Sequence, residues 1–333
     1  MRVMITGGFG FAGSHLAEYL LDQGHEVVLL ARPEGNSGPA EQLRGRARIA
    51  TADLRGFAAL RSILDDTKPE RIFHLAAFSS VIESTRDPRH CYEINFDGTL
   101  NLLEAWRQLG FDSRMLLVSS SNVNGVSPGA DQPLPETSPL RPENPYGGSK
   151  AASEFLAMQF GFSYGLPVVR ARPFQHTGPR QSPAYVCSGL ARQVAEIEMG
   201  LRPPVLEVGN PKVSRDFSDV RDIVRGYTLL VEHGRAGEVY QLCSGQAVPV
   251  SHIIESLTAG SHVSVEVRIN PEKTRGGESP VLWGDPEKAR SEAGWFAQFS
   301  LKQTLDALLA YWKEHVANRV ARDSGVAIHA RRP

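Results

Sequence analysis

The chain has 333 residues, of which 41% are hydrophobic and 22% are charged, and its formal net charge is -1 at pH 7. A chain of this length and composition is expected to fold into two lobes that share one cleft. The near-zero net charge excludes a general electrostatic attraction to nucleic acid or to an anionic membrane, so local arginines would have to hold an anionic ligand.

The three cysteines, Cys91, Cys187 and Cys243, lie far apart and form no Cys-x-x-Cys pair. We expect them to be reduced and mostly packed as small apolar side chains. No His/Cys cluster has ligand spacing, so no metal site is expected. The sequence starts directly on a predicted strand, and no apolar run approaches the ~20 residues that a membrane-spanning helix needs. These features predict a soluble, cytoplasmic protein without a signal peptide.

The first predicted strand, residues 3–5, leads into a glycine-rich turn and then into a helix that begins near Ser14. The glycines have the spacing Gly7-x-x-Gly10-x-x-Gly13, slightly looser than the G-x-G-x-x-G fingerprint of dinucleotide-binding proteins. A strand, a glycine turn and a helix N-terminus in this order bind phosphate through backbone N–H groups and the helix dipole. Glycine turns also end strands for purely structural reasons, so this motif alone is weak.

Strand-like and helix-like stretches alternate through the rest of the first half. We expect strands at residues 25–31, 47–51, 71–77, 114–120 and 166–172, and helices at 57–64, 91–109 and 146–164. Strands separated by helices imply right-handed βαβ units. The pattern predicts an α/β fold with a doubly wound parallel sheet of the Rossmann type.

The last third of the chain is richer in loops, prolines and arginines, with helices expected near residues 186–199, 220–233 and 301–315. We therefore expect a Rossmann domain at residues 1–170, to which later strands return. A smaller, mostly helical lobe at residues 171–320 is expected to cover the cleft and bind the substrate. Residues 321–333 show no sustained periodicity and are expected to form a flexible tail.

Tyr146 and Lys150 lie four residues apart at the start of a predicted helix, so their side chains share one face. A tyrosine hydroxyl has a pKa near ~10 in water, and a neighbouring ammonium favours the phenolate and lowers that pKa. Such a tyrosine can protonate a carbonyl oxygen as hydride arrives, or deprotonate an alcohol as hydride leaves. Because Tyr-x-x-x-Lys is also common by chance on helix surfaces, the pair depends on its context.

Three consecutive serines, residues 119–121, end a predicted central strand, where ligands bind in open α/β sheets. A serine hydroxyl there can hydrogen-bond the same reacting oxygen and hold it near Tyr146. The alternative interpretation is a turn in which serines satisfy backbone groups. The glycine turn, the serines and the Tyr-Lys pair, in this order, favour a redox enzyme.

In these motifs the sequence resembles extended short-chain dehydrogenases/reductases that act on nucleotide sugars. The resemblance runs from residue 1 to about residue 315 and is carried by Gly7-x-x-Gly10-x-x-Gly13, His74-Leu75-Ala76-Ala77, Asn95-x-x-Gly98-Thr99, the serines before Val123-Asn124-Gly125, and Tyr146-x-x-x-Lys150. Within that family the chain is most similar to GDP-4-keto-6-deoxy-D-mannose reductases, through residues 172–179, 213–222, 240–245 and 275–278.

The resemblance implies a role for each matching residue. It places the catalytic Ser/Thr on Ser120, beside Tyr146 and Lys150. Cofactor contacts are implied for Gly7, Gly10, Phe11, Gly13, Arg32, Asp53, Leu54, Leu75, Ala76, Ala77, Asn95 and Lys150. Substrate contacts are implied for Ser80, Ser121, Asn122, Gln175, Arg215, Arg275 and Glu278, with the two arginines on a diphosphate and Glu278 on the ribose or base.

Several of these assignments have plain alternatives. Arginine forks suit the oxygens of a nucleoside diphosphate. Arg215 could instead form a surface ion pair with Asp216 or Asp219, and Arg275 could be a solvated loop residue. Asp53, the candidate adenine contact, could equally cap the following turn.

The sequence also bears on which of the family's reactions is catalysed. The 4,6-dehydratases carry a Glu where this chain has Asn122, and an amide cannot exchange a proton as a carboxylate does, so dehydration is disfavoured. Epimerases usually have an acidic residue after the second strand, where this chain has Arg32. Arg32 could pair with a 2′-phosphate, which favours NADPH as the cofactor. NADH is the alternative, because Glu34 lies nearby and Arg32 could simply face solvent.

We therefore predict an NADPH-dependent reductase of a nucleotide-linked 4-keto-6-deoxy sugar, most specifically of GDP-4-keto-6-deoxy-D-mannose to GDP-D-rhamnose, with Tyr146 as the proton donor. Gln175 replaces the family's usual Asn and Asn124 its usual Tyr, which leaves the identity of the substrate open. The resemblance also implies a homodimer built on the helices near 91–109 and 146–164. The alternatives are a nucleotide-sugar 4-epimerase with tightly bound NAD and a non-catalytic dinucleotide sensor.

Overall fold

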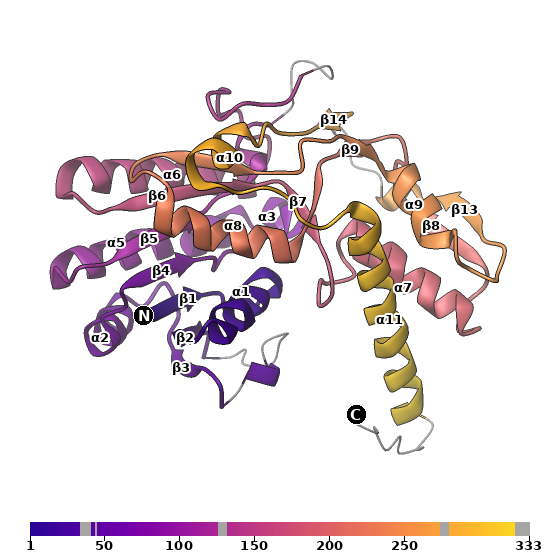
Figure 1. Ribbon diagram of the computed structural model, residues 1–333, viewed down its shortest axis with the longest axis horizontal. Coiled ribbons are helices and arrows are strands. Elements are labelled where there is room, and N and C mark those ends of the chain that lie inside the picture. Colours follow the sequence, from indigo (N-terminus) through magenta and orange to yellow (C-terminus); the bar gives the residue numbers. More distant parts are fainter. Residues whose placement is uncertain (34–40, 44, 126–131, 274–279, 324–333) are drawn as a thin grey trace.

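The computed structural model describes residues 1–33, 41–43, 45–125, 132–273 and 280–323. Its centre is a parallel seven-stranded sheet in the order β11-β6-β5-β4-β1-β2-β3 (Figure 1). The strands are β1 (Arg2–Thr6), β2 (Glu26–Ala31), β3 (Arg48–Thr51), β4 (Arg71–His74), β5 (Arg114–Val118), β6 (Val168–Pro173) and β11 (Val239–Leu242). The chain builds outward from β1 to β3 and then adds β4 on the other side of β1. Ligands of such sheets bind at this reversal, beyond the carboxyl ends of the strands.

Helices cover both faces of the sheet, which confirms the predicted doubly wound fold. One layer contains α1 (Phe11–Asp22), α8 (Val220–His233) and α10 (Glu287–Ala293), and the other contains α2 (Phe57–Thr67), α5 (Gly98–Leu109) and α6 (Pro145–Tyr164). Successive strand side chains point to opposite faces, so Val3 and Ile5 pack in the first layer with Leu16, while Met4 packs in the second with Leu102. This two-sided burial explains the unbroken apolar runs of the strands.

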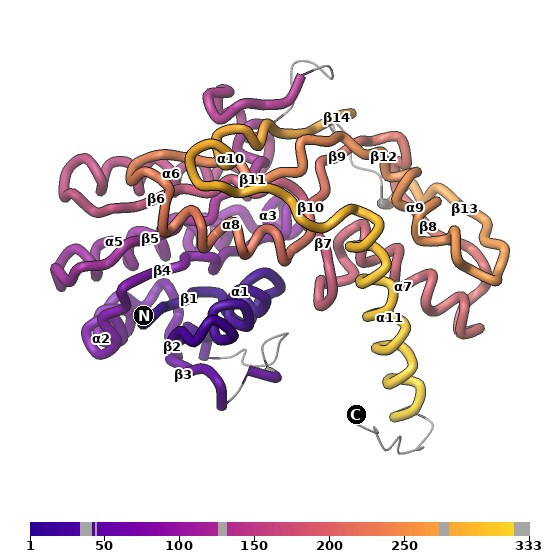
Figure 2. Tube along the Cα trace, in the orientation of Figure 1, coloured from indigo at the N-terminus to yellow at the C-terminus, as the bar shows by residue number. Residues whose placement is uncertain are grey.

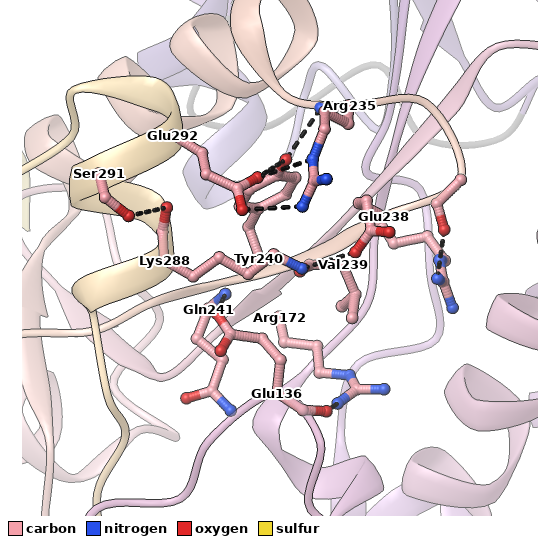
Figure 3. Close-up of polar contacts among 12 residues, drawn as sticks. Glu136, Arg172, Arg235, Glu238, Val239, Tyr240, Gln241, Lys288, Ser291 and Glu292 are labelled. Atoms are coloured by element: carbon pink, nitrogen blue, oxygen red, sulfur yellow. Dashed lines mark hydrogen bonds and ion pairs between the residues drawn. The ribbon is translucent and has the colours of Figure 1, made fainter.

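The outer edge of β11 is covered by charged side chains from three segments (Figure 3). The Gln241 amide donates to Glu136 Oε1 at 2.9 Å, and Lys288 Nζ donates to the Val239 carbonyl at 2.9 Å. The hydroxyl of Tyr240 donates to Glu292 Oε2 at 2.7 Å. The first two contacts satisfy backbone groups that an open edge strand would otherwise offer to another chain.

The second lobe stands beside the sheet, with α7 and α11 packed along each other (Figures 1 and 2). Its helices are α7 (Val186–Glu198), α9 (Val250–Thr258) and α11 (Leu301–Asp323), and its core includes Leu190, Val194, Ile253, Leu308 and Trp312. Its short strands are β7 (Gln175–Thr177), β8 (Val205–Val208), β9 (Ser214–Arg215), β10 (Phe217–Asp219), β12 (Val248–Pro249), β13 (Glu266–Ile269) and β14 (Val281–Leu282). Within the described residues, no helix is long and apolar enough to cross a membrane.

Several boundaries differ from the sequence-based expectations. The strands expected at 71–77 and 114–120 end at His74 and Val118, because the following residues form loops at the site. The helix expected at 91–109 consists of α4 (Pro88–Tyr92), a π-helical turn (Glu93–Asp97) and α5. Helix α3 (Val81–Arg86) and 3-10 turns at Glu41–Leu43, Ser121–Val123 and Pro271–Lys273 complete the described elements.

The structure bears on two of the expected domain limits, at residues 170 and 321. Strand β6 runs across the predicted boundary at residue 170, and β11 joins the same sheet from the second half of the chain. Helix α11 extends to Asp323, so the first residues of the predicted tail at 321–333 are helical, and residues 324–333 lie outside the described part. Cys91, Cys187 and Cys243 are free and buried, as expected.

Candidate active site

The glycine turn between β1 and α1 leaves no room for side chains. Gly7 has a φ of +72°, and a Cβ there would lie 2.7 Å from the Ala76 nitrogen. A Cβ on Gly13 would lie 2.2 Å from the Gly7 carbonyl oxygen. Helix α1 starts after Gly10 with no side-chain cap and no acidic residue in its first turn, as far as the described residues show. Its backbone N–H groups and its dipole therefore fit a pyrophosphate.

Replacing Gly13 by alanine is expected to weaken NADPH binding by about a hundredfold or more, because the new methyl group can only be accommodated if the turn moves away from a phosphate-binding geometry. Isothermal titration calorimetry of NADPH would measure this. Gly260→Ala is the matched control, since a Cβ there meets nothing within 4 Å. Unchanged NADPH affinity in Gly13→Ala would contradict the assignment of this turn.

The loop after β4 is fixed against the glycine turn by a buried histidine. His74 Nδ1 lies 2.7 Å from Thr6 Oγ1, and His74 Nε2 lies 2.9 Å from Thr99 Oγ1. The Ala76 amide donates to the same Thr6 hydroxyl oxygen at 3.1 Å. Burial, with a smaller contribution from the Lys150 charge, lowers the pKa of His74 to about 3, so the ring stays neutral. Leu75 and Ala76 thus lie beside the turn and Ala77 follows them, and their contacts with the cofactor stay a prediction.

Asn95, a predicted cofactor contact, also holds the loop after β4, and its contact with the cofactor stays a prediction. Its side chain is buried, and its Nδ2 donates to Ser149 Oγ at 2.8 Å and to the Phe78 carbonyl at 3.2 Å. Its Oδ1 accepts the Phe78 amide at 2.7 Å. These bonds connect the loop after β4 to α6, so Asn95 acts as a support behind the loop.

At the carboxyl ends of β2 and β3, arginines surround one carboxylate. The Arg55 guanidinium donates two hydrogen bonds to Asp53, from Nε to Oδ1 at 3.0 Å and from Nη2 to Oδ2 at 2.7 Å. The Arg55 hydrogen bond, with a smaller contribution from the charge of Arg32, lowers the pKa of Asp53 to about 2. Arg32 itself is exposed, directly after β2. Leu54, predicted to contact the cofactor, has its side chain in a small core cluster with Leu60.

Ser120, Tyr146 and Lys150 meet at the carboxyl end of β5. Helix α6 starts at Asn144, whose side chain accepts the Gly147 amide at 2.9 Å, and Pro145 occupies the first helical position. Tyr146 therefore lies in the first turn and Lys150 one turn later. Lys150 is 4% exposed, and its Nζ donates to the carbonyl of Val118, the last residue of β5, at 2.7 Å.

The pKa of Tyr146 differs from the expectation that Lys150 lowers it. The Lys150 ammonium donates to the Val118 carbonyl. Burial raises the pKa of Tyr146 to about 12, and an interaction with Ser120 opposes that shift. The phenol is therefore protonated at neutral pH.

Burial also lowers the pKa of Lys150 to about 8, against 10.5 in the unfolded chain. Between these two pH values the unfolded chain binds the proton and the folded chain does not, so stability rises with pH. Relative to Lys150→Met, the wild-type protein is expected to gain about 2 kcal/mol of unfolding free energy between pH 8 and pH 10. Urea titrations across this range would measure the difference. Lys302→Met, at an exposed lysine, is the control. The expectation would be contradicted if the difference in unfolding free energy from wild type changed with pH equally for Lys150→Met and Lys302→Met.

The predicted substrate residues lie on both lobes. Gln175 is in β7, and its buried Oε1 has no hydrogen-bond partner within the described part of the chain, so it can receive a ligand donor. Arg215 is in β9, half-buried, with Nη1 donating to the Ser214 carbonyl at 2.8 Å. Ser80 caps α3, accepting the Glu83 amide at 3.2 Å.

The remaining substrate predictions divide into two groups. Ser121 and Asn122 form the 3-10 turn that follows Ser120, and Ser121 is buried. Arg275 and Glu278 lie outside the described residues, so their contacts stay a prediction.

The structure brings together further residues, Tyr185 and His176, that the sequence reasoning missed. Tyr185, just before α7, lies with its hydroxyl 3.3 Å from Ser79 Oγ, and its proximity raises the pKa of Tyr146. Phe11, after the glycine turn, stacks on His176 of β7, with ring centroids 5.8 Å apart. The position of Phe11 in a cofactor motif could have suggested an aromatic partner, but no local pattern marks Tyr185.

Behind the serines lies a buried ion pair that was also missed. Arg172 donates to Glu154 at 2.8 Å through Nε and at 2.7 Å through Nη2, and the Ser119 hydroxyl donates to Glu154 Oε1 at 2.5 Å. Glu154 is 1% exposed. The pair connects β6, α6 and the serine strand end, and so fixes the backbone that carries Ser120.

Comparisons with known proteins show the family of this chain. Residues 4–308 match the family model for GDP-mannose 4,6 dehydratase. The GDP-6-deoxy-D-mannose reductase of Pseudomonas aeruginosa is 36% identical over 315 residues, which cover 95% of this chain and 98% of the relative. The structure of RMD from Pseudomonas aeruginosa complexed with NADPH has a TM-score of 0.83 at 36% identity, covering 94% of this chain and 99% of its own. A Thermus thermophilus UDP-glucose 4-epimerase complex with NAD has a TM-score of 0.84 at 29% identity, covering 94% and 99%. The chain belongs to the GDP-mannose 4,6-dehydratase family, and its similarity to a reductase extends over nearly the whole length of both proteins.

Proposed function

We propose that this protein is an NADPH-dependent reductase of a GDP-linked 4-keto-6-deoxy sugar, converting GDP-4-keto-6-deoxy-D-mannose to GDP-D-rhamnose. The observation that carries the proposal is the meeting of Ser120, Tyr146 and Lys150 at the carboxyl end of β5, on the same sheet edge as the glycine turn. The full-length similarity to a GDP-6-deoxy-D-mannose reductase supports the base and the sugar.

The residues of the site suit reduction. The turn of Gly7, Gly10 and Gly13 and the start of α1 would hold the pyrophosphate of NADPH, which supplies a hydride when bound. Tyr146 donates its proton to the C4 oxygen of the sugar, and its raised pKa keeps that proton in place at neutral pH until it is needed. Ser120 donates a hydrogen bond to the same oxygen and stabilises the negative charge that develops there.

Residues of the second lobe would bind the nucleotide sugar. Gln175 offers a buried acceptor, and Arg215 offers a guanidinium at the sheet of β9, β12 and β14. We assign Arg215 and Arg275 to the diphosphate and Glu278 to the ribose or base, since arginine forks match phosphate oxygens. Asn122 in place of a carboxylate disfavours dehydration at C5 and C6.

A 4-epimerase is the second candidate, because the Thermus thermophilus epimerase has an equally close fold. An epimerase keeps its cofactor bound between turnovers. The absorbance spectrum of the purified protein separates the two functions, since NAD(H) retained through purification would favour the epimerase.

Arg32 is expected to select NADPH over NADH. Arg32 follows β2 directly and is exposed, so its guanidinium can offer charge-assisted hydrogen bonds to the 2′-phosphate of the adenosine. Arg32→Ala is expected to weaken NADPH binding by about tenfold and to leave NADH binding unchanged. Calorimetric titrations of both cofactors would measure this, with Arg86→Ala, an exposed arginine on α3, as the control. An equal loss for both cofactors would contradict the role.

The homodimer is part of the same proposal. Large apolar side chains are exposed on α4 and α6, where Tyr92 is 40%, Phe155 58% and Phe162 88% exposed. A pair of such helices can bury these side chains against the same faces of a second copy. Analytical ultracentrifugation would measure the mass in solution.

The test of the function is the loss of NADPH absorbance on addition of GDP-4-keto-6-deoxymannose. Turnover, with a 6-deoxy product identified by NMR, would establish the reductase. No turnover would contradict the substrate assignment, and a panel of other nucleotide sugars would follow.

A further inference from the structure

The hydroxyl oxygen of Ser120 accepts two hydrogen bonds from a single residue. The backbone amide of Asn122 donates to Ser120 Oγ at 3.2 Å, and the side-chain Nδ2 of Asn122 donates to the same atom at 3.0 Å. A serine hydroxyl has two acceptor lone pairs and one donor hydrogen. Asn122 therefore fills both acceptor positions and leaves Ser120 only its O–H to offer.

The free O–H has a defined target. Interaction with Ser120 lowers the pKa of the Tyr146 phenol, so the two hydroxyl groups are neighbours. Because Asn122 occupies both acceptor positions of Ser120, the Ser120 hydroxyl can meet the phenol oxygen only as a donor. A donor stabilises the phenolate, which agrees with the direction of the pKa effect.

Asn122 is held firmly enough to impose this direction. It sits inside the 3-10 turn Ser121–Val123, and the Val123 carbonyl accepts the Arg141 amide at 2.9 Å. The first turn of α6 packs directly on residue 122, since a Cβ on Gly147 would lie 2.5 Å from the Asn122 carbonyl oxygen. Gly147 is the neighbour of Tyr146, so the same contact fixes the spacing between the asparagine and the tyrosine.

We infer that Asn122 is a positioning residue, rather than a direct substrate contact, and that it holds the Ser120 hydroxyl as a hydrogen-bond donor that faces Tyr146 in this structure and turns to the reacting oxygen when the substrate is bound. A carboxylate at this position accepts hydrogen bonds only, and would turn the Ser120 O–H toward itself. The amide therefore does more than remove dehydratase chemistry, because it leaves the serine free to stabilise an oxyanion. The kinetic part of this inference rests on the proposed reductase function.

The test is a double-mutant cycle between residues 120 and 122. Asn122→Asp keeps the shape and removes the donor, and is expected to lower kcat by about tenfold with little change in KM. Ser120→Ala is expected to lower kcat further, and adding Asn122→Asp to it is expected to cost no more than twofold. Asn124→Asp is the matched control, because the side-chain amide of Asn124 donates to the Ser138 and Pro139 carbonyls and not to Ser120. Its fold-change in kcat should therefore be the same in the wild-type protein and in Ser120→Ala.

A second readout works without turnover. With 3,5-difluorotyrosine incorporated at position 146, ¹⁹F NMR follows the ionisation of this phenol in the folded protein. Asn122→Asp is expected to raise its pKa by more when Ser120 is present than in Ser120→Ala, where only the added charge acts. A wild-type protein without reductase activity would contradict the proposed function, whereas this titration would still decide the inference. An equal pKa rise in both backgrounds, or a kcat loss that persists fully in Ser120→Ala, would overturn it.

Discussion

Tyr146→Phe is expected to lower kcat for the 4-keto sugar by about 10²–10³-fold, the range that a positioned general acid contributes. Phenylalanine keeps the ring in the first turn of α6 but has no proton to give to the C4 oxygen. NADPH affinity is expected to stay within about twofold, because the glycine turn and Arg32 are untouched. Initial rates of NADPH oxidation and calorimetric titration of NADPH would measure the two quantities.

The control for this change is Tyr19→Phe, the same substitution on α1, which is expected to leave kcat unchanged. A Tyr146→Phe protein with more than about a tenth of the wild-type kcat would show that another group supplies the proton. Tyr185 would then be the next group to replace, since it raises the pKa of Tyr146 and its hydroxyl lies 3.3 Å from Ser79 Oγ.

Glu154→Ala is expected to destabilise the protein by about 3–5 kcal/mol, because it leaves the guanidinium of Arg172 buried without its counter-charge. Arg172 has 5% of its side chain exposed and Glu154 1%, so water cannot replace the lost carboxylate. The Ser119 hydroxyl loses its acceptor at the same time. The free energy of unfolding from urea titrations at pH 7 would measure this loss.

Removing both charges is the informative control. Glu154→Met with Arg172→Met is expected to cost less than Glu154→Ala alone, since apolar side chains of similar volume need no partner. Arg170, which lies 3.6 Å from Glu154, keeps its bond to the Gly237 carbonyl at 2.6 Å. A single-mutant loss below about 1 kcal/mol would mean that solvent reaches this pair.

The sequence by itself determined the sheet and the outline of the site. Apolar runs at the strands and glycines at Gly7, Gly10 and Gly13 are local signals, because burial on two faces and a close backbone approach each restrict the residue type. The four-residue spacing of Tyr146 and Lys150 is also local, since a helix places such residues on one face. The order of these signals along the chain placed the serines at residues 119–121 at the end of the strand beside them, and the family resemblance singled out Ser120.

Only the tertiary structure decided what these groups do to one another. Lys150 is bound to Val118, and the pKa of Tyr146 is raised instead of lowered, because burial and the direction of a long side chain depend on distant residues. Asn95 matched a cofactor motif in the sequence, and only the structure shows that its side chain also bonds the loop at Phe78. Tyr185 comes near Tyr146 only when the two lobes fold together. Hydrogen-bond partners and desolvation are set by contacts between residues far apart in the chain, and these leave no periodic pattern in the sequence.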